Sequence, residues 1–170
     1  MEVREKMDPE VRENTISILV NNKPDVLARI AGTFSGRGFN IESISANITR
    51  NPMVTKIIIT TLSNRETLTK LVKLLNRLLD VLEVEDLTGM ESARREMVLV
   101  RLKTNEHQNA KVLKAVERYG WKCICIEPEG FVLEVTGDKE DIDRALTILE
   151  PLGMDDFTRT GTVALANCSS

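Results

Sequence analysis

Aromatic residues, cysteines and long apolar runs are all scarce in this sequence of 170 residues. Aromatics make up 4% of the chain and hydrophobic residues 42%, so its cores must be built mainly from aliphatic side chains. The three cysteines, Cys123, Cys125 and Cys168, are an odd number at spacings that do not form a disulfide framework. No apolar run is long enough to span a bilayer, and the charged residues 1–6 are not a secretory signal. We therefore expect a soluble, reduced, cytoplasmic protein without a membrane segment.

The groups that usually carry catalysis are also missing. The single histidine, His107, has no second histidine or Cys-x-x-Cys pair with which to form a zinc site. No serine or cysteine lies in a recognisable nucleophile motif, and a phosphate-binding loop is absent. Gly36-Arg37-Gly38 is a poor dinucleotide fingerprint because it ends a predicted helix instead of opening one. The sequence predicts neither an enzyme active site nor a metal site.

The charge balance argues against nucleic-acid binding. The formal net charge is −3 and the pI is about 5.4, whereas a nucleic-acid-binding domain normally has a basic face. RNA-recognition modules place aromatic residues on their central strands. Here the predicted central strands carry Ile, Val and Thr, while Tyr119 and Trp121 lie at a helix end. A binding or regulatory module remains as the interpretation.

Apolar periodicity divides the chain into two successive units of the order βαββαβ. In the first half, Ser63 or Asn64 is expected to cap the second helix, whose core stripe includes Leu78 and Leu79. In the second half, the last strand is interrupted at Gly161. The predicted elements are strand 15–20, helix 24–37, strands 41–49 and 54–62, a helix from about 65 to 79 and strand 81–87, then strand 96–103, helix 105–119, strands 122–127 and 131–136, helix 138–149 and strand 157–166.

This order predicts an α+β protein of two tandem ferredoxin-like sandwiches. Residues 1–13 are expected to be a flexible leader, 14–89 the first domain and 90–170 the second. Right-handed crossovers place the first and third strands of each domain at the centre of its sheet, with both helices on one face. The other face of the first sheet would leave Leu19 and Ile58 exposed. A homodimer, or contact between the two halves, would cover them.

The segment 21–41 has the pattern of a strand end, a polar turn, a helix and a glycine-containing turn. Pro24 suits the first helical position, and the free N–H groups of the first helical turn favour a carboxylate or phosphate. Gly36 and Gly38 are expected to close the helix, since glycine tolerates positive φ. The pattern alone is compatible both with an anion site and with an ordinary turn, cap and core.

The chain from 16 to 45 closely resembles the N-terminal ACT domain of the regulatory (small) subunit of acetolactate synthase, also called acetohydroxyacid synthase. The likeness covers residues 14–166 and leaves the leader outside it. The matching stretches are Val20-Asn21-Asn22-Lys23-Pro24, 26–32, Phe34-Ser35-Gly36-Arg37-Gly38-Phe39-Asn40-Ile41-Glu42-Ser43, 51–53, 79–81, 94–100, 134–137 and 159–161.

The resemblance implies a non-catalytic subunit that binds and activates a separate catalytic large subunit. Thiamine diphosphate, Mg and FAD are expected in that catalytic subunit, and no cofactor is expected in this chain. The resemblance also implies feedback inhibition by valine or another branched-chain amino acid, held between the two ACT domains of a homodimer. A free-standing ACT protein that senses amino acids and regulates another enzyme is the alternative.

Carried over from the family, the effector contacts fall on two short segments of different copies. One copy supplies Asn22, Lys23, Pro24, Asp25 and Val26, and the other supplies Gly38, Phe39, Asn40 and Ile41.

Asp25 departs from the family pattern, which usually has glycine at this position. A resident carboxylate at the helix start would repel the carboxylate of a bound amino acid, so we expect a weak response to valine. Alternatively, Asp25 faces solvent or binds the ammonium group of the effector.

Overall fold

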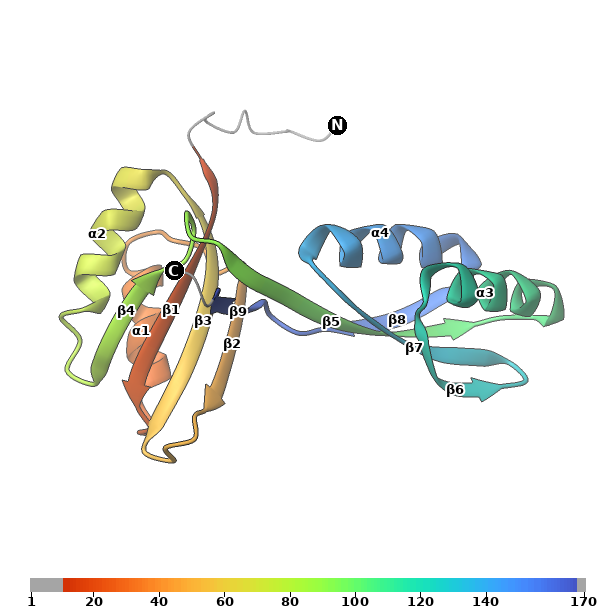
Figure 1. Ribbon diagram of the computed structural model, residues 1–170, viewed down its shortest axis with the longest axis horizontal. Helices are drawn as coiled ribbons and strands as arrows, with labels where there is room; N and C mark the ends of the chain where they lie inside the picture. Colours follow the sequence, from red (N-terminus) through yellow and green to blue (C-terminus); the bar gives the residue numbers. More distant parts are fainter. Residues whose placement is uncertain (1–10, 168–170) are drawn as a thin grey trace. The chain divides into compact units, whose positions relative to one another are not determined.

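The computed structural model describes residues 11–167, which form two compact units (Figure 1). The first unit contains the described residues up to Ala93 together with residues 161–167, and the second is Arg94–Thr160. None of the helices in the described range has both the length and the hydropathy needed to cross a membrane.

The first unit has the predicted βαββαβ order with two helices against one antiparallel sheet. The sheet order is β2-β3-β1-β4, so the first and third strands are central, as predicted. Ile16 and Ile18 of β1 lie opposite Ile59 and Ile57 of β3, and all four side chains are buried in the core. The elements are β1 (Arg12–Asn21), α1 (Val26–Ser35), β2 (Ser43–Ile48), β3 (Val54–Ser63), α2 (Arg65–Leu75) and β4 (Val81–Asp86).

Each helix of this unit buries one stripe of side chains with helical spacing. The stripe of α1 is Val26, Ile30 and Phe34, and that of α2 is Leu68, Leu71 and Leu75. The prediction that Leu79 belongs to the second stripe is wrong. Because α2 ends at Leu75, the helical spacing does not continue, and Leu79 is 85% exposed.

The ends of the helices settle three details of the predicted caps. Asn64, and not Ser63, caps α2, because its side chain accepts a hydrogen bond of 2.9 Å from the Thr67 amide. Asp25 is the N-cap of α1, so Pro24 precedes the helix and does not occupy its first position. Gly36 keeps helical dihedral angles with φ of −64°, and Gly38 alone has the positive φ, at 72°.

The second unit repeats the architecture, with sheet order β6-β7-β5-β8. Its core brings Val100 and Leu133 of the central strands against Val112 of α3 and Ile142 of α4. The elements are β5 (Ser92–Lys103), α3 (Glu106–Tyr119), β6 (Lys122–Glu127), β7 (Gly130–Gly137), α4 (Lys139–Leu149), a 3₁₀ turn at Glu150–Leu152, and β8 (Met154–Arg159). The prediction of two mixed α+β sandwiches is confirmed.

Both ends of the described chain differ from the predicted boundaries. β1 begins at Arg12, so residues 12 and 13 are strand and not leader, while residues 1–10 lie outside the described range. The strand predicted at 157–166 is two strands, because β8 ends at Arg159 and β9 (Val163–Ala166) belongs to the first unit. Between them a Cβ on Gly161 would lie 2.6 Å from the carbonyl oxygen of Ile44, so only glycine fits there without a shift.

The C-terminal segment partly covers the helix-free face of the first sheet. Ile58, predicted to be exposed there, is only 5% exposed because it packs with Leu87 and with Ala164 of β9. Leu19 on the same sheet is half-buried. The exposure of Ile58 is therefore no argument for a second copy of the chain.

Candidate functional site

The loop between β1 and α1 is held in place by contacts to a neighbouring turn. The Asn22 amide donates to the Met53 carbonyl oxygen at 2.8 Å, and the Asn22 side chain donates to the Pro52 carbonyl oxygen at 3.0 Å. The Lys23 amide donates to the Asn21 carbonyl oxygen at 2.9 Å. The loop is thus tied to the β2–β3 turn on one side before α1 begins.

On the other side, the loop and the first turns of α1 are held by Asp80, which immediately precedes β4. The Asp80 side chain is only 5% exposed. Its Oδ1 accepts hydrogen bonds from Lys23 Nζ at 2.7 Å and from Asn21 Nδ2 at 3.1 Å, and its Oδ2 accepts one from Arg29 Nη2 at 2.5 Å. The Asn21 amide also donates to the Asp80 carbonyl oxygen at 2.9 Å. Sequence reasoning gave this residue no role, although it lies in the stretch 79–81 that shares the family likeness.

The donors around Asp80 favour its ionised form. The hydrogen bond from Lys23, followed by that from Asn21, lowers the pKa of Asp80 from 3.8 to about 2, although burial acts in the opposite direction. Arg29 adds a further hydrogen bond that lowers the pKa. Asp80 is therefore ionised at neutral pH, and the cations Lys23 and Arg29 lie next to its negative charge.

Acid should remove the stabilising contribution of Asp80. Because its folded pKa is depressed, the contribution is complete above the unfolded value of 3.8 and is lost as the pH falls toward about 2. We expect the difference in free energy of unfolding between the parent and Asp80→Asn to be constant from about pH 5 to 7 and to shrink between about pH 4 and 2. Urea unfolding at each pH measures it. A difference that does not change down to about pH 2 would contradict the assignment.

The carboxylate of Asp25, unlike that of Asp80, is exposed to solvent. Its side chain is 68% exposed, makes no cap hydrogen bond, and forms an ion pair with Arg29 at 3.3 Å between Oδ1 and Nη2. Arg29 therefore bridges Asp25 and Asp80. The carboxylate of Asp25 faces solvent at the start of α1 and is partly balanced by this one cation.

A hollow of about 250 Å³ lies beside the start of α1. Three of the predicted site residues, Asn22, Lys23 and Val26, line it together with apolar residues of the sheet. Pro24 and Asp25 are not among its lining residues. The remaining lining residues are Val20, Asn21, Leu27, Ala46, Ile48, Thr55 and Ile57.

The other predicted segment, Gly38 to Ile41, follows the opposite end of α1. Phe39 packs edge-to-face on Phe34 with ring centroids 6.4 Å apart, and Ile41 packs against the core. Asn40 Nδ2 donates to Glu42 at 2.7 Å, while the Asn40 carbonyl oxygen accepts from Thr61 Oγ1 at 2.6 Å. Since α1 separates this segment from the hollow, one copy of the chain does not bring the two halves of the predicted site together.

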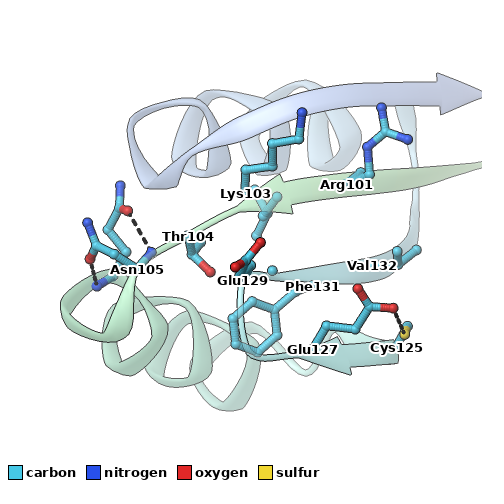
Figure 2. Close-up of a pocket in the computed structure, with 12 residues that line it drawn as sticks. Arg101, Lys103, Thr104, Asn105, Cys125, Glu127, Glu129, Phe131 and Val132 are labelled. Carbon is cyan, nitrogen blue, oxygen red and sulfur yellow. Dashed lines mark hydrogen bonds between the residues drawn. The ribbon is translucent and has the colours of Figure 1, made fainter.

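The second unit has a larger hollow of about 580 Å³ at one end of its sheet (Figure 2). Its cations already have partners, because Arg101 and Lys103 both pair with Asp155, at 2.8 and 2.9 Å. At the other side of the hollow, Cys125 Sγ lies 3.6 Å from a Glu127 carboxylate oxygen. Nothing in this arrangement selects one ligand chemistry.

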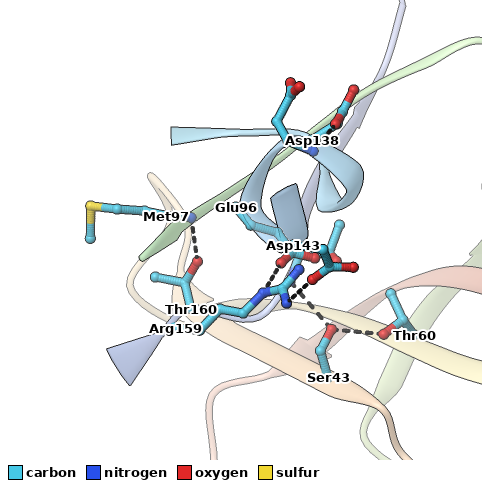
Figure 3. A network of polar contacts seen from close by, with 10 residues as sticks. Ser43, Thr60, Glu96, Met97, Asp138, Asp143, Arg159 and Thr160 are labelled. Atoms are coloured by element: carbon cyan, nitrogen blue, oxygen red, sulfur yellow. Dashed lines mark hydrogen bonds and ion pairs between the residues drawn. The ribbon is translucent and has the colours of Figure 1, made fainter. Parts of the chain in front are cut away.

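Charged groups elsewhere in the second unit form an internal network. Arg159 of β8 pairs with Glu96 of β5, and its Nη1 lies 2.7 Å from Asp143 Oδ1 on α4 (Figure 3). These contacts tie an edge strand to the sheet and a helix. Within residues 11–167, no group of three or more His, Cys, Asp or Glu side chains is placed to hold a metal ion.

Both halves of the chain match models of known families. Residues 16–83 match the AHAS small subunit-like ACT domain, and residues 95–168 match the small subunit of acetolactate synthase. The resemblance inferred from the sequence is confirmed by these two matches.

Whole-length relatives and a solved structure agree with the two models. The chain is 34% identical to the acetolactate synthase small subunit of Aquifex aeolicus over 163 residues, which are 95% of this chain and 85% of the relative. It is 33% identical to the probable acetolactate synthase small subunit of Methanothermobacter thermautotrophicus, covering 96% and 97% of the two chains. The crystal structure of the small subunit from Thermotoga maritima matches with a TM-score of 0.85 and 28% identity, covering 92% of this chain and 98% of that one. The chain therefore belongs to the family of acetolactate synthase small subunits.

Proposed function

We propose that this chain is the non-catalytic regulatory subunit of an acetolactate synthase, which it binds and activates. The support is its family membership over both halves. The thiamine-diphosphate-dependent chemistry, with its Mg and FAD, then belongs to the catalytic large subunit. We assign effector binding and dimerisation to the first unit, which carries the predicted ACT domain, and assign no separate role to the second unit.

The effector that fits the first unit best is a branched-chain amino acid such as valine. The observation that carries this proposal is the hollow beside the start of α1, because polar and apolar side chains line the same small volume. Lys23, Asn22 and the first amides of α1 are suited to a carboxylate, while Val26, Ile48 and Ile57 offer an apolar surface to an aliphatic side chain. Its volume of about 250 Å³ is just below the range of about 300–1,000 Å³ typical of sites for larger ligands.

The second half of the effector site comes from a partner copy in this proposal. Gly38 to Ile41 lie beyond the far end of α1, so a homodimer is needed to bring them to the Asn22–Val26 segment of another copy. Asn40 can offer both a donor and an acceptor across such an interface.

Asp25 weakens the response to valine in this proposal. Its exposed carboxylate is at the helix end that would receive the effector carboxylate, and Arg29 balances only part of its charge. The subunit therefore activates its partner but is inhibited by valine only at raised concentrations.

Co-purification tests the assembly part of the proposal. We expect the tagged chain to retain the catalytic acetolactate synthase subunit of the same organism, co-expressed with it, through gel filtration. If the chain never associates with that enzyme but does bind an amino acid, the result would favour the alternative, a free-standing ACT protein that senses amino acids and regulates another enzyme.

A further inference from the structure

The strongest unassigned feature of the first unit is the buried carboxylate of Asp80. It lies at the end of the connection from α2 to β4, and its side chain is nearly inaccessible. Burying an ionised carboxylate is unfavourable unless it is paired and hydrogen-bonded. The buried carboxylate of Asp80 therefore needs the hydrogen bonds that the neighbouring loop supplies in this conformation.

Within the described residues, the side-chain donors to Asp80 come from one short segment. Asn21 ends β1, Lys23 lies in the loop and Arg29 is on the second turn of α1. The same segment contributes Asn21, Lys23 and Val26 to the hollow beside α1. A single side chain outside the loop thus contacts two residues that line the hollow, Asn21 and Lys23, and one residue of the adjoining helix, Arg29.

The charges around the hollow depend on the same contacts. Lys23 and Arg29 are committed to Asp80 at 2.7 and 2.5 Å, and Arg29 also contacts Asp25. The contacts to Asp80 therefore fix where the two cations lie, and a carboxylate that enters the hollow meets Lys23 already held in place.

We propose that Asp80 is the positioning residue of the effector site, which holds the Asn21–Arg29 segment in the conformation that receives the amino acid. The proposal rests on the assignment of the hollow as the effector site. Asp80 itself does not line the hollow and need not touch the effector.

Asp80→Asn is a sharp test, because it keeps the size of the side chain but leaves one acceptor oxygen where two are used. Either the contact to Arg29 or the contacts to Lys23 and Asn21 must be lost, since the amide nitrogen would face a donor. Glu83→Gln is the matched control. It removes the same charge from an exposed position on β4, three residues after Asp80.

Hydrogen exchange of the full chain reads out the position of the loop directly. The amides of Asn21, Asn22 and Lys23 are all hydrogen-bonded in the structure, so their exchange reports opening. We expect exchange over residues 21–29 to be faster by roughly tenfold or more in Asp80→Asn, with α3 unchanged and no effect in Glu83→Gln.

Titration with L-valine, below the unfolding temperature of every variant, separates positioning from stability and from charge. We expect Asp80→Asn to weaken valine binding by roughly tenfold, and Glu83→Gln, which removes the same charge, to bind valine as the parent does. Unchanged valine affinity in the folded Asp80→Asn chain, or unchanged exchange over residues 21–29, would overturn the proposal. If the parent binds no valine at all, the effector assignment fails, while the exchange experiment still decides the role of Asp80.

Discussion

Replacing Asp25 by glycine should lower the valine concentration that half-inhibits the reconstituted holoenzyme by about fivefold to tenfold. Two carboxylates about 4 Å apart repel by about 1 kcal/mol in water and by more where they are partly buried. Because Asp25 is mostly exposed and paired with Arg29, the effect should stay near the lower end of that range. Glycine at an N-cap is also well tolerated, and Asp25 makes no cap hydrogen bond that would be lost.

Asp25→Asn and Asp25→Ala separate the possible causes. If charge repulsion decides the response, both variants should gain sensitivity as the glycine variant does. If close approach of the effector to the backbone decides it, only glycine should. Inhibition curves that are identical for the parent and all three variants would show that Asp25 has no influence on the effector.

Truncation of Phe34 should have the largest effect on stability. Phe34 is fully buried at the end of α1 and contacts Phe39, and the Phe39 amide donates to the Phe34 carbonyl oxygen at 3.0 Å. We expect Phe34→Ala to lower the free energy of unfolding of the first unit by about 3–5 kcal/mol, from lost burial and the cavity that remains. Loss of the ring should also release Phe39 and loosen the Gly38–Ile41 segment.

Urea unfolding, with hydrogen exchange as the probe, can assign this loss of free energy of unfolding to one unit. The matched control is Leu79→Ala, an aliphatic truncation in the same unit at a position that is almost fully exposed, which should change the free energy by less than about 0.5 kcal/mol. Equal effects of the two substitutions would mean that Phe34 is not part of the core described here.

Local patterns predicted the elements and their order because their information lies within a few residues. Leu68, Leu71 and Leu75 recur at helical spacing, and this stripe is the one that α2 buries. The same reasoning failed at Leu79, since spacing does not reveal where a helix ends. At the other end of the chain, Gly161 correctly marked a break in a strand, but the pattern could not show that β9, which pairs with β5, belongs to the first unit.

The candidate site was only partly accessible from the sequence. The family likeness directed attention to residues 22–26, and the structure places Asn22, Lys23 and Val26 around one hollow. Asp80 was missed because its partners lie 51 to 59 residues away, and no periodicity records such a contact. The role of the Gly38–Ile41 segment stays a prediction because it depends on a second copy of the chain.

The most direct test is the rate of acetolactate formation by the catalytic subunit of the same organism, measured with and without this chain. We predict that adding the chain in increasing amounts raises the rate to a plateau, whereas the chain alone forms no acetolactate. A catalytic subunit whose rate is unchanged at every ratio of the two chains would contradict the regulatory role.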